Sequence, residues 1–290
     1  MIEAYVRSVR NRYPDLTIRT AEPIESGQNN YVLLVNGDLI FRFPKYGEGI
    51  RALRLETAVL KALRGRLPLR VPYPEYEALQ SERVGDVFAG YKRIEGEPLT
   101  RERFEAIRDP GKLRVMAEQL AGFMRALHGA ELGTGEVPGL PAYRGAAEWR
   151  ELYERIETKL FPYMSEAGKR EARRHFEPFV ADGSPLDVEP AWIHGDFGTS
   201  NLLYDPERAS ITGVIDFGFA GPGDPATDYA ALLASYGDDF LSMVMEFNPD
   251  SRAYYERALF YKGTFALQEA LFGLEHDDAD AFRAGMELYR

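Results

Sequence analysis

The pattern of apolar and polar positions predicts a small sheet with one helix at the start of the chain. The segments 31–35 and 39–43 are rich in β-branched and aromatic residues, and Asn36-Gly37 lies between them. Both turn residues tolerate positive φ, so the pattern predicts a β-hairpin. A helical spacing of apolar residues follows over 50–64, and 87–94 is typical of a further strand.

After Glu95-Gly96-Glu97-Pro98 the pattern changes to long helices. Residues 112–128 repeat apolar side chains at helical spacing, and 211–215 predicts a strand within this second half. The polar, turn-forming segment marks a boundary between an N-terminal domain, 1–94, and a C-terminal domain, 95–290. Further helices are predicted over 147–160, 166–180, 225–236, 238–247, 251–272 and 277–289.

Composition narrows the possible partners. The chain has 290 residues, a formal net charge of -11 and no cysteine. An acidic surplus argues against nucleic-acid binding, and the lack of cysteine excludes disulfides, thiolate metal sites and cysteine nucleophiles. No secretory signal or membrane-length apolar run is visible. We therefore expect a cytoplasmic protein with no membrane partner, and a monomer, because no long apolar stripe is left unexplained.

The residues that carry chemistry are gathered between the helices of the second half. Asp196 and Asn201 stand five positions apart in one predicted loop, and the strand 211–215 delivers Asp216. A hairpin would bring the second carboxylate back beside the first. Two carboxylates and an amide oxygen are hard ligands that suit Mg²⁺. The spacing matches the catalytic loop of kinases, in which one Asp orients the acceptor hydroxyl while an Asn and a second Asp hold the metal.

These motifs resemble the aminoglycoside phosphotransferase family, and the pattern upstream is most similar to its 2″-phosphotransferases. The matching residues are His194-Gly195-Asp196 with Asn201, Ile215-Asp216-Phe217-Gly218, and Gly223-Asp224-Pro225 with Asp228. The resemblance implies an α+β, protein-kinase-like bilobal fold, with a small antiparallel sheet in the N-lobe and a mainly helical C-lobe. It also implies transfer of the γ-phosphate of ATP or GTP, with Mg²⁺, to a hydroxyl of a small molecule. In that case Asp196 is catalytic, and Asn201 and Asp216 bind the metal.

The N-lobe offers candidate nucleotide-binding residues. The loop that would cover the phosphates contains Ser26, Gly27, Gln28 and Asn29, with backbone N–H groups as donors. Kinases place a Lys on the following strand and pair it with a helix Glu. Here that strand carries Arg42, and Glu56 stands at the expected helix position; Arg can also bind phosphate bidentately. We favour Arg42 over Lys45, which lies beyond Pro44 with the opposite strand parity.

The segment that joins the two halves is expected to lie against the nucleotide base. Backbone groups of Arg93 and Ile94 are the candidate hydrogen-bond partners. Because backbone contacts do not depend on side-chain identity, ATP and GTP both remain open as donors.

Several neighbours of the central motif have structural interpretations. His194 is expected to shape the loop from behind Asp196, Asp228 to brace that loop by hydrogen bonds, and Asp224 to cap a helix. Phe219 departs from the family, because many relatives have Asp after the Asp-Phe-Gly run.

The acceptor is expected near Asp196 in the C-lobe, and an acidic wall would suit an aminoglycoside, which is a polycation. A macrolide or a metabolite such as a sugar or amino alcohol remains an alternative acceptor. Because Arg42 replaces the usual Lys, a nucleotide-binding protein with little transfer activity is a second alternative. The same carboxylates would also suit a metal-dependent hydrolase, which is a third. Candidate acceptor contacts are Asp238, Asp239, Glu246, Glu269, Glu275, Tyr236, Tyr255, Tyr261 and Gln268.

Overall fold

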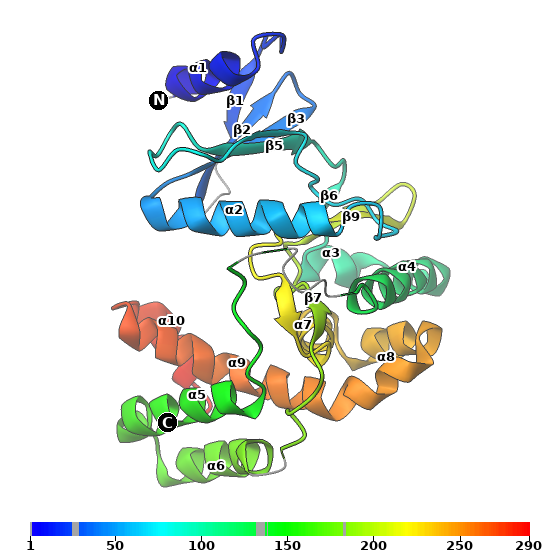
Figure 1. The fold of residues 1–290 in the computed structure, drawn as a ribbon. Helices are drawn as coiled ribbons and strands as arrows, with labels where there is room; N and C mark the ends of the chain where they lie inside the picture. The colour runs from blue at the N-terminus through cyan, green and yellow to red at the C-terminus, as the bar shows by residue number, and fades with distance from the viewer. Residues whose placement is uncertain (1, 25–28, 132–136, 138, 182–183) are drawn as a thin grey trace.

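The computed structural model describes residues 2–24, 29–131, 137, 139–181 and 184–290, and it has the α+β architecture that the sequence predicts (Figure 1). An antiparallel sheet lies at the N-terminal end, and helices make up most of the remainder. The division after residue 94 stays a prediction.

The N-terminal sheet has five strands in the order β1-β2-β3-β5-β4, all paired antiparallel. The predicted hairpin is confirmed: Val35 pairs with Leu39, and the turn residues Asn36 and Gly37 have φ values of 53° and 80°. The strands are β1 (Ala21–Ile24), β2 (Asn30–Val35), β3 (Leu39–Pro44), β4 (Tyr76–Ala78) and β5 (Phe88–Lys92).

The two faces of this sheet pack against different helices. Helix α1 (Ile2–Arg12), which the pattern analysis did not predict, places Tyr5 and Val9 against Phe41 and Phe43. Helix α2 (Gly47–Ala62) covers part of the other face. Alternation along β3 therefore turns Arg42 toward the α2 side, away from the aromatic core.

The C-terminal helices agree closely with the periodicity, apart from the short α3 (Arg101–Ala106), which was not predicted. Two of them begin at side-chain caps: the Asp109 side chain accepts from Gly111 N, and the Ser165 side chain accepts from Gly168 N. The segment expected to be helical from 251 starts as a 3₁₀ turn, and its α-helix begins at 255. The helices are α3 (Arg101–Ala106), α4 (Pro110–His128), α5 (Ala146–Lys159), α6 (Glu166–Val180), α7 (Ala226–Tyr236), α8 (Asp238–Phe247), α9 (Tyr255–Glu275) and α10 (Ala279–Met286), with 3₁₀ turns at Phe161–Tyr163 and Pro249–Tyr254.

Two small sheets hold the loops that carry the chemistry. Strand β7 (Ala191–Ile193) pairs with β10 (Gly221–Gly223), and β8 (Leu202–Asp205) pairs with β6 (Glu97–Pro98) and β9 (Ser210–Val214). In Figure 1 this region lies between the N-terminal sheet with α2 above and the helices α7 and α9 below. No helix within the described ranges is both long enough and apolar enough to cross a membrane.

Candidate active site

Asp196 and Asn201 lie in the loop that joins β7 to β8. The side-chain nitrogen of Asn201 donates to the Asp196 carboxylate at 2.9 Å and to the Asp196 carbonyl at 2.8 Å. Asn201 is 4% exposed, whereas the Asp196 carboxylate reaches solvent. A buried amide therefore fixes the orientation of an accessible carboxylate, and the Asn201 carbonyl oxygen is turned away from it.

The return of the chain along β9 places Asp216 beside this loop. The N–H of Ile215 donates to the backbone carbonyl of Asn201 at 2.9 Å, so the residue before Asp216 is joined to Asn201. Asp216 has a φ of 64°, a left-handed conformation that is rare for a residue with a side chain. Strain of this kind is found more often at functional sites than elsewhere, and the Asp216 side chain is exposed.

The donor set agrees with a kinase-type metal site. No group of three or more His, Cys, Asp or Glu side chains in the described ranges could hold a metal ion. Mg²⁺ needs fewer protein ligands when phosphate oxygens complete its coordination. The side-chain carbonyl oxygen of Asn201, which accepts from the Ser200 hydroxyl at 3.2 Å, and the exposed Asp216 carboxylate are hard donors of the kind such a site uses.

Arg42 and Glu56 form a nearly buried ion pair. Arg42 Nη1 lies 2.5 Å from Glu56 Oε1, and the side chains are 15% and 4% exposed. Burial opposes the charge on Arg42, yet Glu56 raises the guanidinium pKa above its ordinary value, and the charge of Asp216 adds to this effect. Arg42 is thus a permanent cation in the electrostatic field of Asp216. The structure confirms the predicted pairing, while Lys45 lies over the ring of Tyr31, 5.4 Å from its centroid.

Asp228 braces the catalytic loop from α7. Its carboxylate accepts from the N–H groups of His194 and Gly195, each at 2.9 Å, and pairs with His128 Nε2 at 3.0 Å. Burial would raise the pKa of this carboxyl, but the hydrogen bond and charge of His128, with those of His194, hold it below the ordinary value. The bracing role predicted from the sequence is confirmed.

His194 also occupies its predicted place behind Asp196. Its Nε2 lies 3.0 Å from the Ile215 carbonyl, and its Nδ1 accepts from the Asp196 N–H at 3.2 Å. Both ring nitrogens are therefore engaged with the backbone, and the buried imidazole joins the two loops of the site.

Gly195 stands where protein kinases have Arg, and local packing explains the glycine. Its φ is 80°, and a Cβ atom there would lie 2.5 Å from the Phe219 carbonyl oxygen. No larger residue fits without moving the Phe219 backbone. The Phe219 side chain itself is 74% exposed.

The backbone groups expected to meet the nucleotide base are not all free. The Arg93 N–H donates to the Asp38 carbonyl at 2.7 Å, so it already has a partner. The Arg93 carbonyl and the Ile94 N–H have no backbone partner among the described residues, and they remain the candidate groups. The partner of Arg93 comes from the β2–β3 turn, and the sequence pattern alone did not place that turn next to the segment that joins the two halves.

Most of the predicted phosphate-covering loop, Ser26, Gly27 and Gln28, lies outside the described residues. Asn29 is described: its carbonyl accepts from the Lys45 N–H at 3.1 Å, and its side-chain oxygen accepts from the Tyr46 hydroxyl.

Asp224 does more than cap a helix. Its carboxylate accepts from the Ala226 N–H at 2.9 Å, as the cap prediction requires. It also pairs with Arg257 at 2.6 Å and accepts from the Tyr261 hydroxyl at 2.9 Å. With an exposure of 1%, this carboxylate ties α9 to β10, next to the catalytic loop.

The structure sorts the candidate acceptor contacts. Glu275 pairs with Arg155 at 2.5 Å and with Lys159 at 2.6 Å, hydrogen bonds that lower its pKa to about 2. Glu246 pairs with Arg114 at 3.2 Å. Their charges are thus already countered. Tyr236 and Tyr261 are buried, and both hydroxyl groups donate within the core, while Gln268 donates to Thr264. Asp238 and Asp239, where α8 begins, and Glu269 are exposed, and Asp238 accepts from the Tyr255 hydroxyl at 2.8 Å.

Comparison with known proteins shows the family of the chain. The model of the phosphotransferase enzyme family, APH, matches residues 20–269. The chain belongs to this family. It is also 33% identical over 274 residues to viomycin phosphotransferase from Streptomyces vinaceus, with 92% of each chain covered.

Solved structures of aminoglycoside phosphotransferases share the fold of this chain over nearly its whole length. The complex of APH(2″)-IIIa with GDP and kanamycin is 30% identical, with a TM-score of 0.86 over 98% of this chain and 96% of that one. The GDP complex of wild-type aminoglycoside 2'-phosphotransferase-IIIa is 29% identical, with a TM-score of 0.88 over 99% of this chain and 96% of that one. The chain is thus a small-molecule phosphotransferase with a protein-kinase-like fold.

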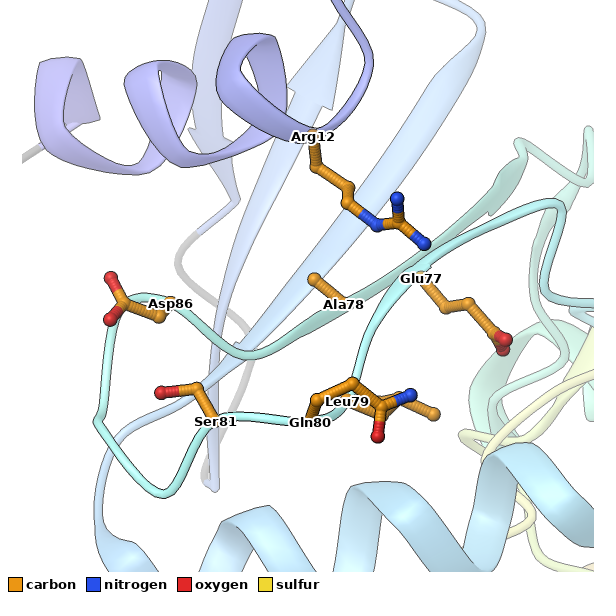
Figure 2. Close-up of a pocket in the computed structure, with 7 residues that line it drawn as sticks. All are labelled: Arg12, Glu77, Ala78, Leu79, Gln80, Ser81 and Asp86. Carbon is orange, nitrogen blue, oxygen red and sulfur yellow. The ribbon is translucent and has the colours of Figure 1, made fainter.

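A pocket of about 240 Å³ lies away from the candidate active site. It is found in the N-terminal region, between the end of α1 and the segment that follows β4 (Figure 2). Arg12, Glu77 and Asp86 are among its lining residues, and Glu77 is paired with Lys61 at 2.5 Å. None of the residues predicted for catalysis, metal or nucleotide lines it.

Proposed function

We propose that this phosphotransferase moves the γ-phosphate of ATP or GTP to a hydroxyl group of an aminoglycoside-like, cationic small molecule. The observation that carries the proposal is the hydrogen-bonded pair of Asp196 and Asn201, with Asp216 returned beside it. The names of its relatives support this acceptor class: one phosphorylates viomycin, and another was solved with kanamycin.

In this proposal Asp196 holds the acceptor hydroxyl and takes up its proton. The carboxylate is accessible to an acceptor, and Asn201 fixes its direction. Asn201 and Asp216 would hold Mg²⁺, which when bound neutralises charge on the phosphate oxygens. Positioning of this kind supplies most of the rate enhancement in phosphoryl transfer.

Arg42 would hold the α- and β-phosphates. Its ion pair with Glu56 fixes the guanidinium, and the same pairing raises the guanidinium pKa and so favours the charged form. This local cation matters because the chain as a whole carries a net charge of -11, which repels a nucleotide. The remaining surplus favours a cationic acceptor, and the exposed pair Asp238 and Asp239 supplies negative charge at the start of α8.

A direct test measures transfer with radiolabelled Mg-ATP and Mg-GTP against kanamycin, viomycin and a neutral macrolide. The Asp196→Asn variant serves as the control for contaminating kinases. Phosphorylated kanamycin or viomycin from the wild type alone, confirmed by mass spectrometry, is the expected result. Transfer only to the macrolide would replace the cationic acceptor with a neutral one. Nucleotide binding without transfer to any acceptor would overturn the proposal in favour of a nucleotide-binding protein.

A further inference from the structure

The side of Gly198 where a Cβ atom would stand faces both the Asp196 carboxylate and the last turn of α7. A methyl group built on Gly198 would lie 3.8 Å from Asp196 Oδ1 and 3.9 Å from Ser235 Oγ. Apart from the chain neighbours of Gly198, no other described atom comes within 4 Å of that point. The candidate catalytic oxygen and the Ser235 hydroxyl therefore border the same space.

Ser235 is unusual for its helix. The segment Tyr229–Tyr236 is otherwise made of alanine, leucine and tyrosine, and most of it is buried. A helical serine commonly returns its hydroxyl to the carbonyl four residues earlier. The Ser235 hydroxyl makes no such bond and no other hydrogen bond to a described residue. A half-buried hydroxyl without a partner, next to the catalytic carboxylate, is available to a substrate.

We infer that Ser235 positions the acceptor, by a hydrogen bond to a hydroxyl or amino group adjacent to the hydroxyl that Asp196 holds. This inference rests on the proposed function and deepens it. It assigns the acceptor to vicinal diols and amino alcohols, because the two oxygens border one space. The absence of a side chain at Gly198 leaves room for the acceptor, since any side chain there would stand close to both the Asp196 carboxylate and the Ser235 hydroxyl.

The test compares Ser235→Ala and Gly198→Ala with the wild type and with Ser81→Ala, a matched serine control on the distant segment drawn in Figure 2. The added methyl of Gly198→Ala makes only ordinary van der Waals contacts, so that variant is expected to fold. Thermal unfolding and the affinity for Mg-nucleotide check that the rest of the protein is intact. Steady-state transfer is then measured with kanamycin and viomycin as the acceptors.

For Ser235→Ala we expect kcat/KM for the acceptor to fall roughly tenfold, the effect of one lost hydrogen bond, with nucleotide affinity unchanged. Gly198→Ala loses acceptor turnover more severely, again with normal nucleotide affinity. In the wild-type product, NMR places the phosphate on a hydroxyl whose adjacent carbon carries oxygen or nitrogen.

Wild-type turnover with acceptor constants unchanged in Ser235→Ala would overturn the inference. So would a product phosphate with no polar group on either adjacent carbon. If the wild type transfers phosphate to neither probe, the proposed cationic acceptor fails, and the assignment of Ser235 fails with it.

Discussion

The side-chain amide of Asn201 donates to the carboxylate of Asp196 at 2.9 Å and leaves its own carbonyl oxygen directed elsewhere. One buried residue thereby orients the candidate base, and in the proposed site the same residue would also hold the metal. The proposal thus couples two functions through a single amide, and that coupling can be tested.

Asn201→Ala removes both functions. We expect kcat to fall roughly 10- to 100-fold, the usual effect of losing a supporting contact to a metal or its ligands. The Mg²⁺ concentration for half-maximal activity should rise as well, and chelation by EDTA should abolish transfer in both proteins. Metal titrations of the wild type and the variant measure this. An unchanged metal requirement would remove Asn201 from the metal site.

Arg42→Gln leaves Glu56 buried and unpaired at 4% exposure. Breaking a buried pair typically destabilises a protein by about 3–5 kcal/mol, whereas neutralising both partners avoids most of that loss. We therefore expect Arg42→Gln to lower the free energy of unfolding and the double variant with Glu56→Gln to restore much of it. Both variants should bind nucleotide more weakly. Urea unfolding and nucleotide titrations separate the two effects, and wild-type nucleotide affinity in the double variant would contradict the phosphate role of Arg42.

The charge of the Asp228 carboxylate makes the stability of the protein depend on pH. Its folded-state pKa lies below the ordinary value, so its stabilising contribution is fully present above about pH 4 and is lost as the pH falls further, through the depressed folded pKa. Asp228→Asn should therefore be less stable than the wild type at pH 7, and the difference should shrink below pH 4. Unfolding midpoints measured from pH 7 to pH 3 test this. A difference that stays constant with pH would show that the carboxylate charge contributes nothing.

Gly195→Ala tests the packing of the loop. The substitution combines a φ of 80° with a contact of 2.5 Å to the Phe219 carbonyl oxygen. We expect a destabilisation of about 1–3 kcal/mol together with a large loss of kcat, because Asp196 is the next residue. Gly37→Ala is the control, since its φ is also 80° but a Cβ there meets nothing within 4 Å. Equal activity loss in both variants would contradict a specific effect at the catalytic loop.

Local signals in the sequence predicted much of the fold and the centre of the site. The Asn36-Gly37 turn and the spacing of Asp196, Asn201 and Asp216 are short-range features, and the structure contains all of them in the expected arrangement. Helix α1 was not predicted because only Tyr5 and Val9 are buried on it, too few to show a clear period. Its stability comes from contacts with the sheet.

Ion pairs between residues far apart in the sequence could not be predicted from local patterns. Arg257 meets Asp224 across 33 positions, and Arg155 meets Glu275 across 120. For that reason Glu275 stood among the candidate acceptor contacts. Ser235 was missed because a serine in an apolar helix has no pattern of its own, and only the fold brings it to Gly198.

The assignment of Asp196 as the group that takes the acceptor proton is the central claim, and single-turnover transfer by Asp196→Asn tests it most directly. Asparagine keeps an oxygen that can accept from Asn201, so the loop should stay in place. We predict normal Mg-nucleotide affinity and a transfer rate lower by about 10²–10⁴-fold. A transfer rate equal to that of the wild type, with a genuine acceptor, would contradict the account.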